Sequence, residues 1–394
     1  MAISKLSIDE FLQLSGVHPV LDVRSPGEFA HAHIPGAHSL PLFSDEERKI
    51  VGTAYKQESK EKAIKLGLDF FGTKMVKMVE EVEEIVKSHP ASRGRKVNSE
   101  EKTIIVHCWR GGMRSAGVAW LLDLYGFKVY TLVGGYKVYR KWVLQQFEKK
   151  YPINLVGGYT GSGKTEALHA IAKKKQPVID LEKLASHKGS AFGNLGQPQQ
   201  PSQEMFENLL AGELKMTVDR WQMAEEQLTD DSCVMTEKAD TPTSVNRHLS
   251  SVNCPSAIWI EDESQRIGEV NIPTPFYQQM RGSQIYFINI PFEERLNFIV
   301  EHYGKFEKEK LMNAIMRIKK RLGGLETKTA LGCLVENDVK GCFAVLLLYY
   351  DKFYLKSLQS RDNFSSLFNN LELSIVSHEE SARQLLSFTK QVAI

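Results

Sequence analysis

The stretch INLVGGYTGSGKTEALHAIAKKK (residues 153–175) decides the fold of the middle of this chain. Its apolar beginning predicts a β-strand and its end predicts a helix. Between them, GYTGSGKT (158–165) satisfies the pattern G-x-x-x-x-G-K-[ST], and a strand followed by this loop and a helix is the context that identifies a phosphate-binding P-loop. The sequence therefore predicts a P-loop α/β domain with a phosphorylated ligand, and leaves open whether ATP is ever bound or hydrolysed.

The residues of this loop have separate expected roles. Glycines let phosphate approach the backbone, Lys164 reaches the terminal phosphates, and Thr165 can hold Mg²⁺. The predicted phosphate or diphosphate contacts are Gly158, Thr160, Gly161, Ser162, Gly163, Lys164 and Thr165. Asp180 ends the next predicted strand and can face the site. Further along, AIWIEDES (257–264) resembles a Walker B segment, so Glu261 and Asp262 are also candidates for the ligand or metal side of the site. Ordinary surface carboxylates are the alternative, and no metal site made of protein ligands alone is expected.

A second anion-binding loop is predicted upstream, in HCWRGGMRS (107–115). It fits H-C-x5-R-S, between an apolar strand and a helix. Backbone N–H groups in such a loop converge on a tetrahedral anion, while the helix N-terminus and two guanidinium groups favour the thiolate of Cys108. Arg114 can bind two oxygens in a fork geometry. We expect Cys108, Arg110 and Arg114 to be catalytic, rather than Cys108 to be a small buried cysteine.

The chemistry of this loop alone leaves two enzyme classes open. H-C-x-x-G-x-x-R-S is also the signature of cysteine-dependent phosphatases. The flanking stretches LDVRSPGEFAHAHIPGAHSLPL (21–42) and GFKVYTLVGGYKVYRKW (126–142), however, resemble the N- and C-terminal signatures of rhodaneses. Common sulfur-transferring rhodaneses have one residue fewer in the loop, and the longer loop matches the branch that resembles cell-cycle phosphatases. That length favours a phosphorus-centred anion over thiosulfate.

The pattern of apolar and polar residues divides the chain into three parts. Alternating strands and helices predict a rhodanese-like parallel-sheet domain over 1–148, with a charged helical insertion over about 44–100 that ends in a polar loop. A P-loop NTPase-like α/β domain is expected over 149–292 and a helical C-terminal region over 293–394. The fold class is therefore α/β, with helix starts expected after Ser7 and Ser44.

Composition narrows the class of protein. The chain has 394 residues, of which 42% are hydrophobic and 25% charged, as in ordinary globular proteins. No apolar run approaches the ~20 residues needed to span a bilayer, so no membrane partner is expected, and the first residues do not resemble a signal peptide. Five cysteines without a C-x-x-C pair argue against disulfides or a zinc site and favour the cytoplasm. The net charge of +2 neither requires nor excludes a nucleic acid.

Candidate RNA contacts lie in local basic segments. EKEKLMNAIMRIKKRLGG (307–324) places Arg317, Lys320 and Arg321 on one helical face. EDESQRIG (261–268) adds Arg266, which can meet a phosphate of the ligand or of RNA. A solvated helix face is the alternative for these charges.

The motifs together resemble the tRNA 2-selenouridine synthase family over essentially the full chain. Besides the two loops, the resemblance rests on ERKIVGTAYKQESKEKAIKLG (47–67), DLEKLASHKGSAFG (180–193) and IEDESQRIG (260–268). Single motifs occur in other families, but their order and spacing are specific. The resemblance implies a tRNA-modifying transferase with no tightly bound cofactor, while oligomeric state and the choice of tRNAs are left open.

The reaction that the resemblance implies takes place on 2-thiouridine at wobble position 34 of the anticodon loop. A geranyl group from geranyl diphosphate is attached to its sulfur, and selenium from selenophosphate then replaces the S-geranyl group. We expect the P-loop to bind the diphosphate and the Cys108 loop to handle selenophosphate, which a selenophosphate-producing enzyme would supply. Cys108 would either carry selenium as a selenosulfide or remove phosphate from a seleno-phosphoryl intermediate.

Further candidate residues and competing functions are also considered. Trp109 is a candidate wall for the geranyl chain or a base, with a structural role as the alternative. His187 and Ser190 are candidate substrate contacts, whereas His31 and His33 are expected to stabilise a turn rather than bind metal. The competing functions are a sulfurtransferase with a regulatory nucleotide domain, a cysteine phosphatase fused to a P-loop kinase, and a non-enzymatic scaffold.

Overall fold

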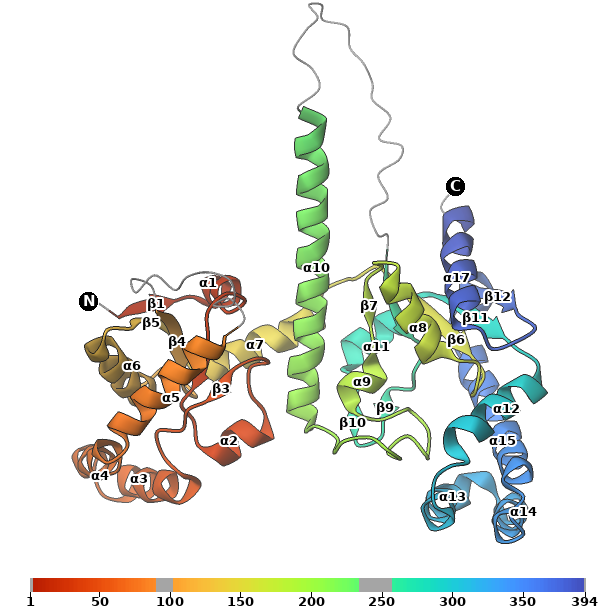
Figure 1. Cartoon of the computed structure of the whole chain (residues 1–394), viewed down its shortest axis with the longest axis horizontal. Coiled ribbons are helices and arrows are strands. Elements are labelled where there is room, and N and C mark those ends of the chain that lie inside the picture. Colours follow the sequence, from red (N-terminus) through yellow and green to blue (C-terminus); the bar gives the residue numbers. More distant parts are fainter. Residues whose placement is uncertain (1–2, 90–101, 234–256, 393–394) are drawn as a thin grey trace, which may run out of the picture. The chain divides into compact units, whose positions relative to one another are not determined.

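The computed structural model describes residues 3–89, 102–233 and 257–392, and the chain forms two compact units (Figure 1). The first comprises residues 1–146 with 207–209, and the second comprises 147–206 with 210–394. The division falls between residues 146 and 147, close to the change of pattern in the sequence. The predicted polar loop at 90–101 lies outside the described residues.

The first unit is built on a five-stranded parallel sheet with strand order β1-β5-β4-β2-β3. Its strands are β1 (Ser4–Leu6), β2 (Val20–Asp22), β3 (His38–Ser39), β4 (Thr103–His107) and β5 (Lys128–Leu132). Its helices are α1 (Ile8–Leu14), α2 (Pro26–His31), α3 (Asp45–Gln57), α4 (Lys60–Gly72), α5 (Met75–Ser88), α6 (Met113–Tyr125) and α7 (Gly135–Gln146). The parallel order confirms the α/β architecture predicted for this part, although β1 was not anticipated.

Local sequence explains where these helices begin. The side chains of Ser7 and Ser44 each accept a hydrogen bond from the backbone N–H of the glutamate three residues on. The carboxylate of that glutamate accepts one from the backbone N–H of the serine, which completes a capping box. Both predicted helix starts are therefore confirmed. The inserted helices α3–α5 pack on one face of the sheet, where Phe43, Phe71 and Val82 join the core with Val106. β4 is buried along its whole length, as expected of a central parallel strand.

The second unit is built on another five-stranded parallel sheet, in the order β12-β11-β6-β8-β7. Its strands are β6 (Ile153–Gly158), β7 (Val178–Ile179), β8 (Ile258–Glu261), β11 (Gln284–Asn289) and β12 (Phe368–Glu372), with a separate antiparallel pair β9 (Arg266–Ile267) and β10 (Val270–Asn271). Its helices are α8 (Lys164–Lys173), α9 (Leu181–Ala185), α10 (Gln203–Cys233), α11 (Thr274–Arg281), α12 (Phe292–Tyr303), α13 (Lys308–Leu322), α14 (Gly324–Val335), α15 (Val339–Gln359), α16 (Phe364–Leu367) and α17 (His378–Val392).

The C-terminal region is mainly helical, as predicted, but it also completes this sheet. β12 pairs with β11, and α17 packs against α8. The sequence did not reveal β12 because FNNLE has two asparagines and little apolar character, so only pairing with a neighbouring strand makes it extended. Among the described residues, no helix is long and apolar enough to cross a membrane.

Two candidate anion-binding sites

Cys108 lies directly after β4, at the start of the loop that leads into α6. Its side chain is buried, and the backbone N–H of Gly112 donates a hydrogen bond to its Sγ at 3.3 Å. The Ser115 hydroxyl lies 3.3 Å from the same sulfur and 3.0 Å from the Gly112 carbonyl. The loop therefore curls around the thiol and directs hydrogen-bond donors toward it, as predicted for an anion nest.

The pKa of the Cys108 thiol is set by two opposing effects. Burial raises this pKa, but hydrogen bonds from the Ser115 hydroxyl and from the backbone of Ser115, Gly112 and Arg110 outweigh burial, and the pKa is lowered from its ordinary value. The thiolate, which is the nucleophilic form, is thus favoured. From the sequence we expected the helix N-terminus and the two guanidinium groups to favour the thiolate, and no guanidinium is among the groups that lower this pKa. Hydrogen-bond donors of the loop itself are what stabilise the thiolate here.

Gly134 and Gly135, which follow β5, lie close to the Cys108 loop. Gly135 has φ +58°, and a Cβ there would lie 2.3 Å from the Cys108 carbonyl oxygen, so only glycine allows this close approach. The next residue, Tyr136, donates its backbone N–H to that same carbonyl at 2.8 Å. The LVGGYKVYR stretch thus fixes the position of the loop.

A buried ion pair between Arg24 and Asp22 stabilises the first unit near Tyr136. Arg24 donates to both carboxylate oxygens of Asp22, at 2.9 and 2.6 Å, and to the Ala32 carbonyl at 2.7 Å. Its guanidinium also lies 3.8 Å from the centre of the Tyr136 ring. The LDVRSPGEF stretch therefore carries structural residues. Its Arg24 packs on Tyr136, the residue whose backbone N–H binds the Cys108 carbonyl. His33 Nδ1 donates to the Phe29 carbonyl oxygen at 2.9 Å, and the His33 ring stacks on the Phe29 ring, which agrees with a role in the turn.

The two arginines of the Cys108 loop differ in their contacts. Arg114 Nη1 lies 2.8 Å from Glu28 Oε2, and Arg48 Nε lies 2.8 Å from the same carboxylate oxygen. Arg110 is exposed at the tip of the loop. Arg114 is thus held by Glu28 at the start of α6, where a small exchange of partners would let it bind an anion in the loop.

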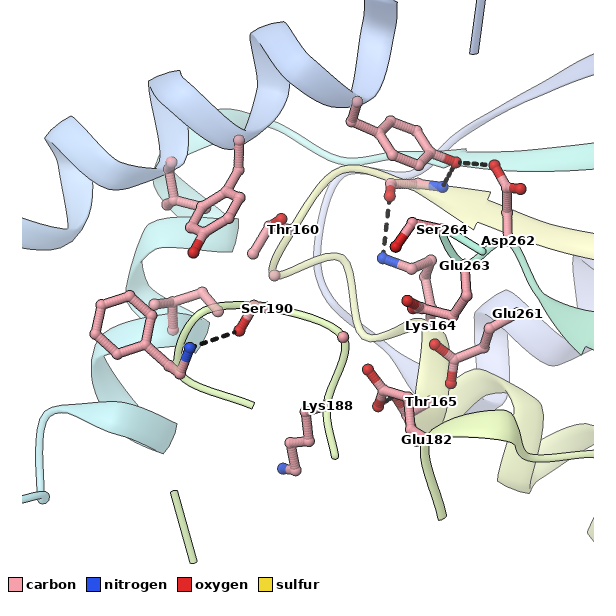
Figure 2. A pocket seen from close by; sticks show the side chains of 18 of the residues that line it. Thr160, Lys164, Thr165, Glu182, Lys188, Ser190, Glu261, Asp262, Glu263 and Ser264 are labelled. Carbon is pink, nitrogen blue, oxygen red and sulfur yellow. Dashed lines mark hydrogen bonds between the residues drawn. The ribbon is translucent and has the colours of Figure 1, made fainter. Parts of the chain in front are cut away.

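The P-loop runs from the end of β6 into α8 and lines a cavity of about 550 Å³ (Figure 2). Lys164 Nζ donates to the Gly158 carbonyl at 3.1 Å, and Gly161 has φ +84°, with a would-be Cβ only 2.8 Å from the Arg295 carbonyl oxygen. Six of the seven predicted phosphate contacts line the cavity: Gly158, Thr160, Gly161, Gly163, Lys164 and Thr165. Ser162 is instead buried and donates to the Tyr159 carbonyl, so it shapes the loop.

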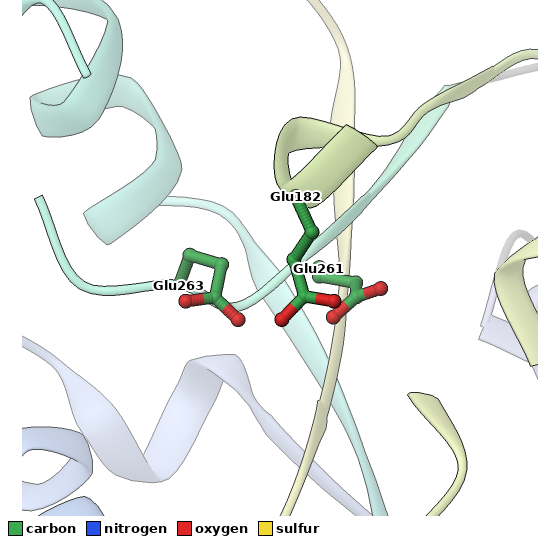
Figure 3. A group of neighbouring side chains, drawn as sticks. All are labelled: Glu182, Glu261 and Glu263. Atoms are coloured by element: carbon green, nitrogen blue, oxygen red, sulfur yellow. The ribbon is translucent and has the colours of Figure 1, made fainter. Parts of the chain in front are cut away.

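Three carboxylates, those of Glu182, Glu261 and Glu263, converge in the same cavity (Figure 3). One oxygen each of Glu182, Glu261 and Glu263 lies within 4.8 Å of the others, and Thr165 Oγ1 donates to Glu182 Oε2 at 3.1 Å. Burial, followed by repulsion from neighbouring carboxylates, raises the pKa of all three to about 8. Hard oxygen ligands next to a P-loop hydroxyl fit a divalent cation such as Mg²⁺, which would relieve this repulsion.

Apart from the P-loop and the carboxylates, the lining of the cavity is mainly aromatic and aliphatic, with a few polar residues such as Ser190 and Arg321. Side chains of α12, α15 and the 187–196 loop form its far wall, including Phe192, Phe298, Ile299, Tyr303, Phe343 and Leu347. Several of them also belong to the helical core of the C-terminal region. The P-loop cavity therefore has a charged end, with phosphate-binding and carboxylate groups, and an aromatic end.

Family models match both units. A rhodanese-like domain matches residues 7–141, and the AAA domain of tRNA 2-selenouridine synthase matches residues 151–254 and 244–382. The chain belongs to the tRNA 2-selenouridine synthase family. A tRNA 2-selenouridine synthase of Bdellovibrio bacteriovorus is 31% identical, with 87% of this chain and 89% of that protein aligned. One of Nitrosomonas europaea is 34% identical over 72% of this chain and 63% of its own length. A solved yeast protein tyrosine phosphatase of the rhodanese family covers 36% of this chain at 15% identity and a TM-score of 0.23.

Membership in the selenouridine synthase family accords with both loops, but other candidate residues have different places. Asp180 caps α9 and pairs with His169 at 2.7 Å. Asp262 lines the cavity, but it pairs with Arg361 and accepts from Tyr354 at 2.8 Å. Neither belongs to the carboxylate cluster; of the three predicted acidic candidates, only Glu261 does. Ser190 lines the cavity, whereas His187 is buried and is not among the lining residues.

The candidate RNA contacts differ in their surroundings. Arg317 donates to the Ala191 carbonyl at 3.1 Å and to Asn194 at 3.0 Å, so it holds the 187–196 loop, while Arg321 lines the P-loop cavity. Lys320 is exposed on α13. Arg266 is exposed as well, and its Nε donates to the Gly268 carbonyl at 2.9 Å. Charge spacing on a helix cannot reveal such backbone partners, because they come from other segments.

Sequence reasoning missed four residues that shape the P-loop site. Glu182 and Glu263 complete the carboxylate cluster. Arg295 donates to the Thr160 carbonyl at 3.1 Å and pairs with Asp351, while the Gly158 N–H donates to the Tyr354 hydroxyl at 3.3 Å. Glu182 and Glu263 lay within stretches already singled out, DLEKLASHKGSAFG and EDESQRIG, whereas no local motif marked Arg295 or Tyr354.

Proposed function

We propose that this chain converts 2-thiouridine at the wobble position of tRNA to 2-selenouridine, through an S-geranyl intermediate. The observation that carries this proposal is the pairing, in one chain, of a thiolate-bearing anion loop with a P-loop cavity that has an apolar end. Family membership supports the selenation, and the two sites suggest how the steps are divided. We expect the reaction in the cytoplasm, where tRNA is modified and free thiols stay reduced.

Geranyl transfer is assigned to the P-loop site. A prenyl diphosphate has a charged head and an apolar tail, and the cavity offers Lys164 and the P-loop amides at one end and aromatic side chains at the other. Mg²⁺ held by Thr165 and the three glutamates would supply charge neutralisation for the diphosphate. In the transfer, the thiouridine sulfur attacks C1 of the geranyl group, the C–O bond breaks and diphosphate leaves. The N3 proton of the base is released to solvent.

Selenation is assigned to the Cys108 loop. Selenium of selenophosphate attacks C2 of the base, the C2–S bond breaks and geranylthiol leaves, which gives a C2–Se–phosphoryl intermediate. The Cys108 thiolate then attacks phosphorus, so that the Se–P bond breaks and the selenouridine is released. Water finally hydrolyses the phosphocysteine to phosphate and restores the thiol.

Electron balance favours this phosphatase role over a selenium carrier. Selenium in selenophosphate is already at the selenide level. A selenosulfide on Cys108 would need either an oxidant or the departure of phosphorus as phosphite, whereas attack on phosphorus needs neither. The one-residue-longer loop, which suits tetrahedral phosphorus-centred anions, points the same way. A Cys108–selenium adduct in mass spectra of the trapped enzyme would contradict this assignment.

The decisive experiment is nucleoside mass spectrometry on a 2-thiouridine anticodon stem-loop incubated with enzyme, geranyl diphosphate and selenophosphate. Wild type should yield 2-selenouridine, and Cys108→Ala should stop at the S-geranyl form, with selenation slowed at least about 10³-fold. Cys333→Ala, which removes a half-buried thiol in the other unit, is the matched control and should behave as wild type. Unchanged RNA, with wild-type turnover of thiosulfate or an aryl phosphate instead, would support the sulfurtransferase or phosphatase alternatives.

A further inference from the structure

A second large cavity lies within the first unit, beside the Cys108 loop. It has a volume of about 920 Å³ and is formed by the inserted helices α3 and α4 on one side and the start of α6 on the other. Tyr55, Leu68, Met113 and Trp120 line it although each is more than half exposed. Large apolar side chains gathered around one hollow are a mark of a binding site on a soluble domain.

The rim of this cavity has one sign of charge. Of the described residues that line it, five are basic and none is acidic; the basic ones are Arg48, Lys49, Lys56, Arg110 and Arg114. Glu28 pairs with Arg48 and Arg114 from outside the lining, so part of the positive charge is compensated. An apolar interior with a basic rim fits an apolar chain that is attached to a polyanion.

The geometry points to the S-geranyl group of the RNA intermediate as the occupant of this cavity, a statement that rests on the proposed function. We infer that the ten-carbon chain enters between α3, α4 and α6, while the basic rim contacts phosphates of the anticodon loop. The lining residue Arg110 belongs to the Cys108 loop itself, and Met113, Arg114 and Gly117 lie on the helix that follows it. The C2–S bond of the bound intermediate would therefore lie next to the loop that delivers selenium.

This placement explains why the geranyl group precedes selenation. After geranylation, the sulfur can leave as geranylthiol. The geranyl chain also buries itself in the cavity, which holds the base beside the Cys108 loop. When selenium attacks C2, the C2–S bond breaks, and the geranylthiolate takes a proton from solvent while its chain is still in the cavity. Each methylene that is buried tightens binding by about fourfold, so the chain can serve as the main anchor of the base.

The test fills the cavity without disturbing either loop. Gly52 lines the cavity on α3, and a Cβ at this position meets nothing within 4 Å, so Gly52→Phe places a ring in open space. Gly72 at the end of α4 also has open space around its Cβ but does not line the cavity, so Gly72→Phe is the matched control. Trp120→Ala removes part of the cavity wall instead of filling the cavity. It keeps the inference testable if Gly52→Phe does not fold.

Three measurements with the full-length chain distinguish the outcomes. For Gly52→Phe we expect selenation of a pre-geranylated stem-loop to fall at least about tenfold, with geranylation of the 2-thiouridine stem-loop changed less than twofold. An S-methyl stem-loop should be selenated equally well by Gly52→Phe and wild type, because its short group does not need the cavity. Trp120→Ala should raise the KM for the geranylated RNA more than it lowers kcat.

Opposite results overturn the inference. If Gly52→Phe lost geranylation but kept selenation, the cavity would hold geranyl diphosphate, the donor. Equal losses with S-geranyl and S-methyl RNA, or no loss at all, would exclude a chain-binding role.

Binding of S-geranyl-2-thiouridine nucleoside, measured by calorimetry without selenophosphate, separates this inference from the proposed function. Wild type and Gly72→Phe should bind it, and Gly52→Phe should bind at least about tenfold more weakly. That pattern would support the cavity even if wild type catalysed neither step. Failure of wild type to prefer the S-geranyl over the S-methyl nucleoside would overturn the inference even if both steps ran.

Discussion

The two anion-binding loops share a backbone plan and differ in their side chains. Each follows a buried parallel strand, β4 or β6, and leads into a helix, α6 or α8, so both place backbone N–H groups at the carboxyl end of a sheet. In the first loop the group at the centre is the Cys108 thiol, held by Gly112 and Ser115. In the second it is the Lys164 ammonium, beside a cluster of three glutamates.

In the proposed function, this difference lets one backbone plan serve two reactions. A hydrogen-bonded thiolate is a nucleophile that can form a covalent bond to phosphorus. A lysine with a cation site binds a diphosphate and stabilises its departure without forming such a bond. Both cavities also have an apolar part, and that shared property fits a prenyl group that is taken up at one loop and lost at the other. The predictions below test this division of roles.

The largest effect is expected for Lys164→Ala. Loss of the ammonium removes the main positive charge that faces the diphosphate, so geranylation should fall at least about 100-fold. Selenation of a pre-geranylated stem-loop should stay within twofold of wild type, as followed by nucleoside mass spectrometry. Lys173→Ala, at the exposed far end of the same helix, controls for general loss of positive charge. The reverse pattern, with selenation lost and geranylation spared, would show that the roles of the two loops are exchanged.

The carboxylate cluster should make cation binding depend on pH. Because the pKa of Glu182, Glu261 and Glu263 is raised to about 8, protons must leave before Mg²⁺ binds, and affinity should increase from pH 7 to pH 9. Glu261→Gln should weaken Mg²⁺ binding about tenfold and reduce this dependence. Calorimetry in buffers of different ionisation enthalpy would count the released protons. A wild-type affinity that is flat across this range would contradict the cluster as a cation site.

The same cluster predicts how stability changes with pH when Mg²⁺ is removed. A glutamate whose pKa is higher in the folded than in the unfolded chain stabilises the fold while it is protonated. Stability in EDTA should therefore be greatest below about pH 4.5 for this contribution and should be lost as pH rises through about 8. The Tm of Glu261→Gln should change less than that of wild type over this range, and Mg²⁺ should restore the wild-type Tm at pH 8.

The smallest effect is expected for Ser115→Ala. The Ser115 hydroxyl helps to lower the pKa of Cys108, so its removal should shift the acidic limb of the selenation profile to higher pH. At pH 6.5 the rate should fall about threefold and should recover at pH 8.5, where the thiol ionises without this help. The pH profile of geranylation by the same variant is the internal control. A uniform loss at all pH values would indicate a structural role for Ser115.

The features that could be predicted are those that depend on residues close together in the sequence. Both loops, their flanking strands and helices, and the capped starts at Ser7 and Ser44 are confirmed, because a P-loop or a capping box is written within a few residues. The contacts of Arg317, Asp180 and Asp262 were not predictable. Their partners come from other segments, and a charge that appears exposed in a helical pattern can be held by a distant carbonyl or side chain.

Sequence by itself determined the two α/β units, the thiol and lysine at the centre of the two loops, and the family. Only the tertiary structure decided which carboxylates meet, because Glu182 follows β7, Glu261 ends β8, and these two strands become neighbours in a parallel sheet. It also decided that Trp120 rather than Trp109 lines the cavity beside Cys108, since Trp109 packs on Tyr136. A cavity is the space between segments that are distant in sequence, and its shape exists only once those segments have packed.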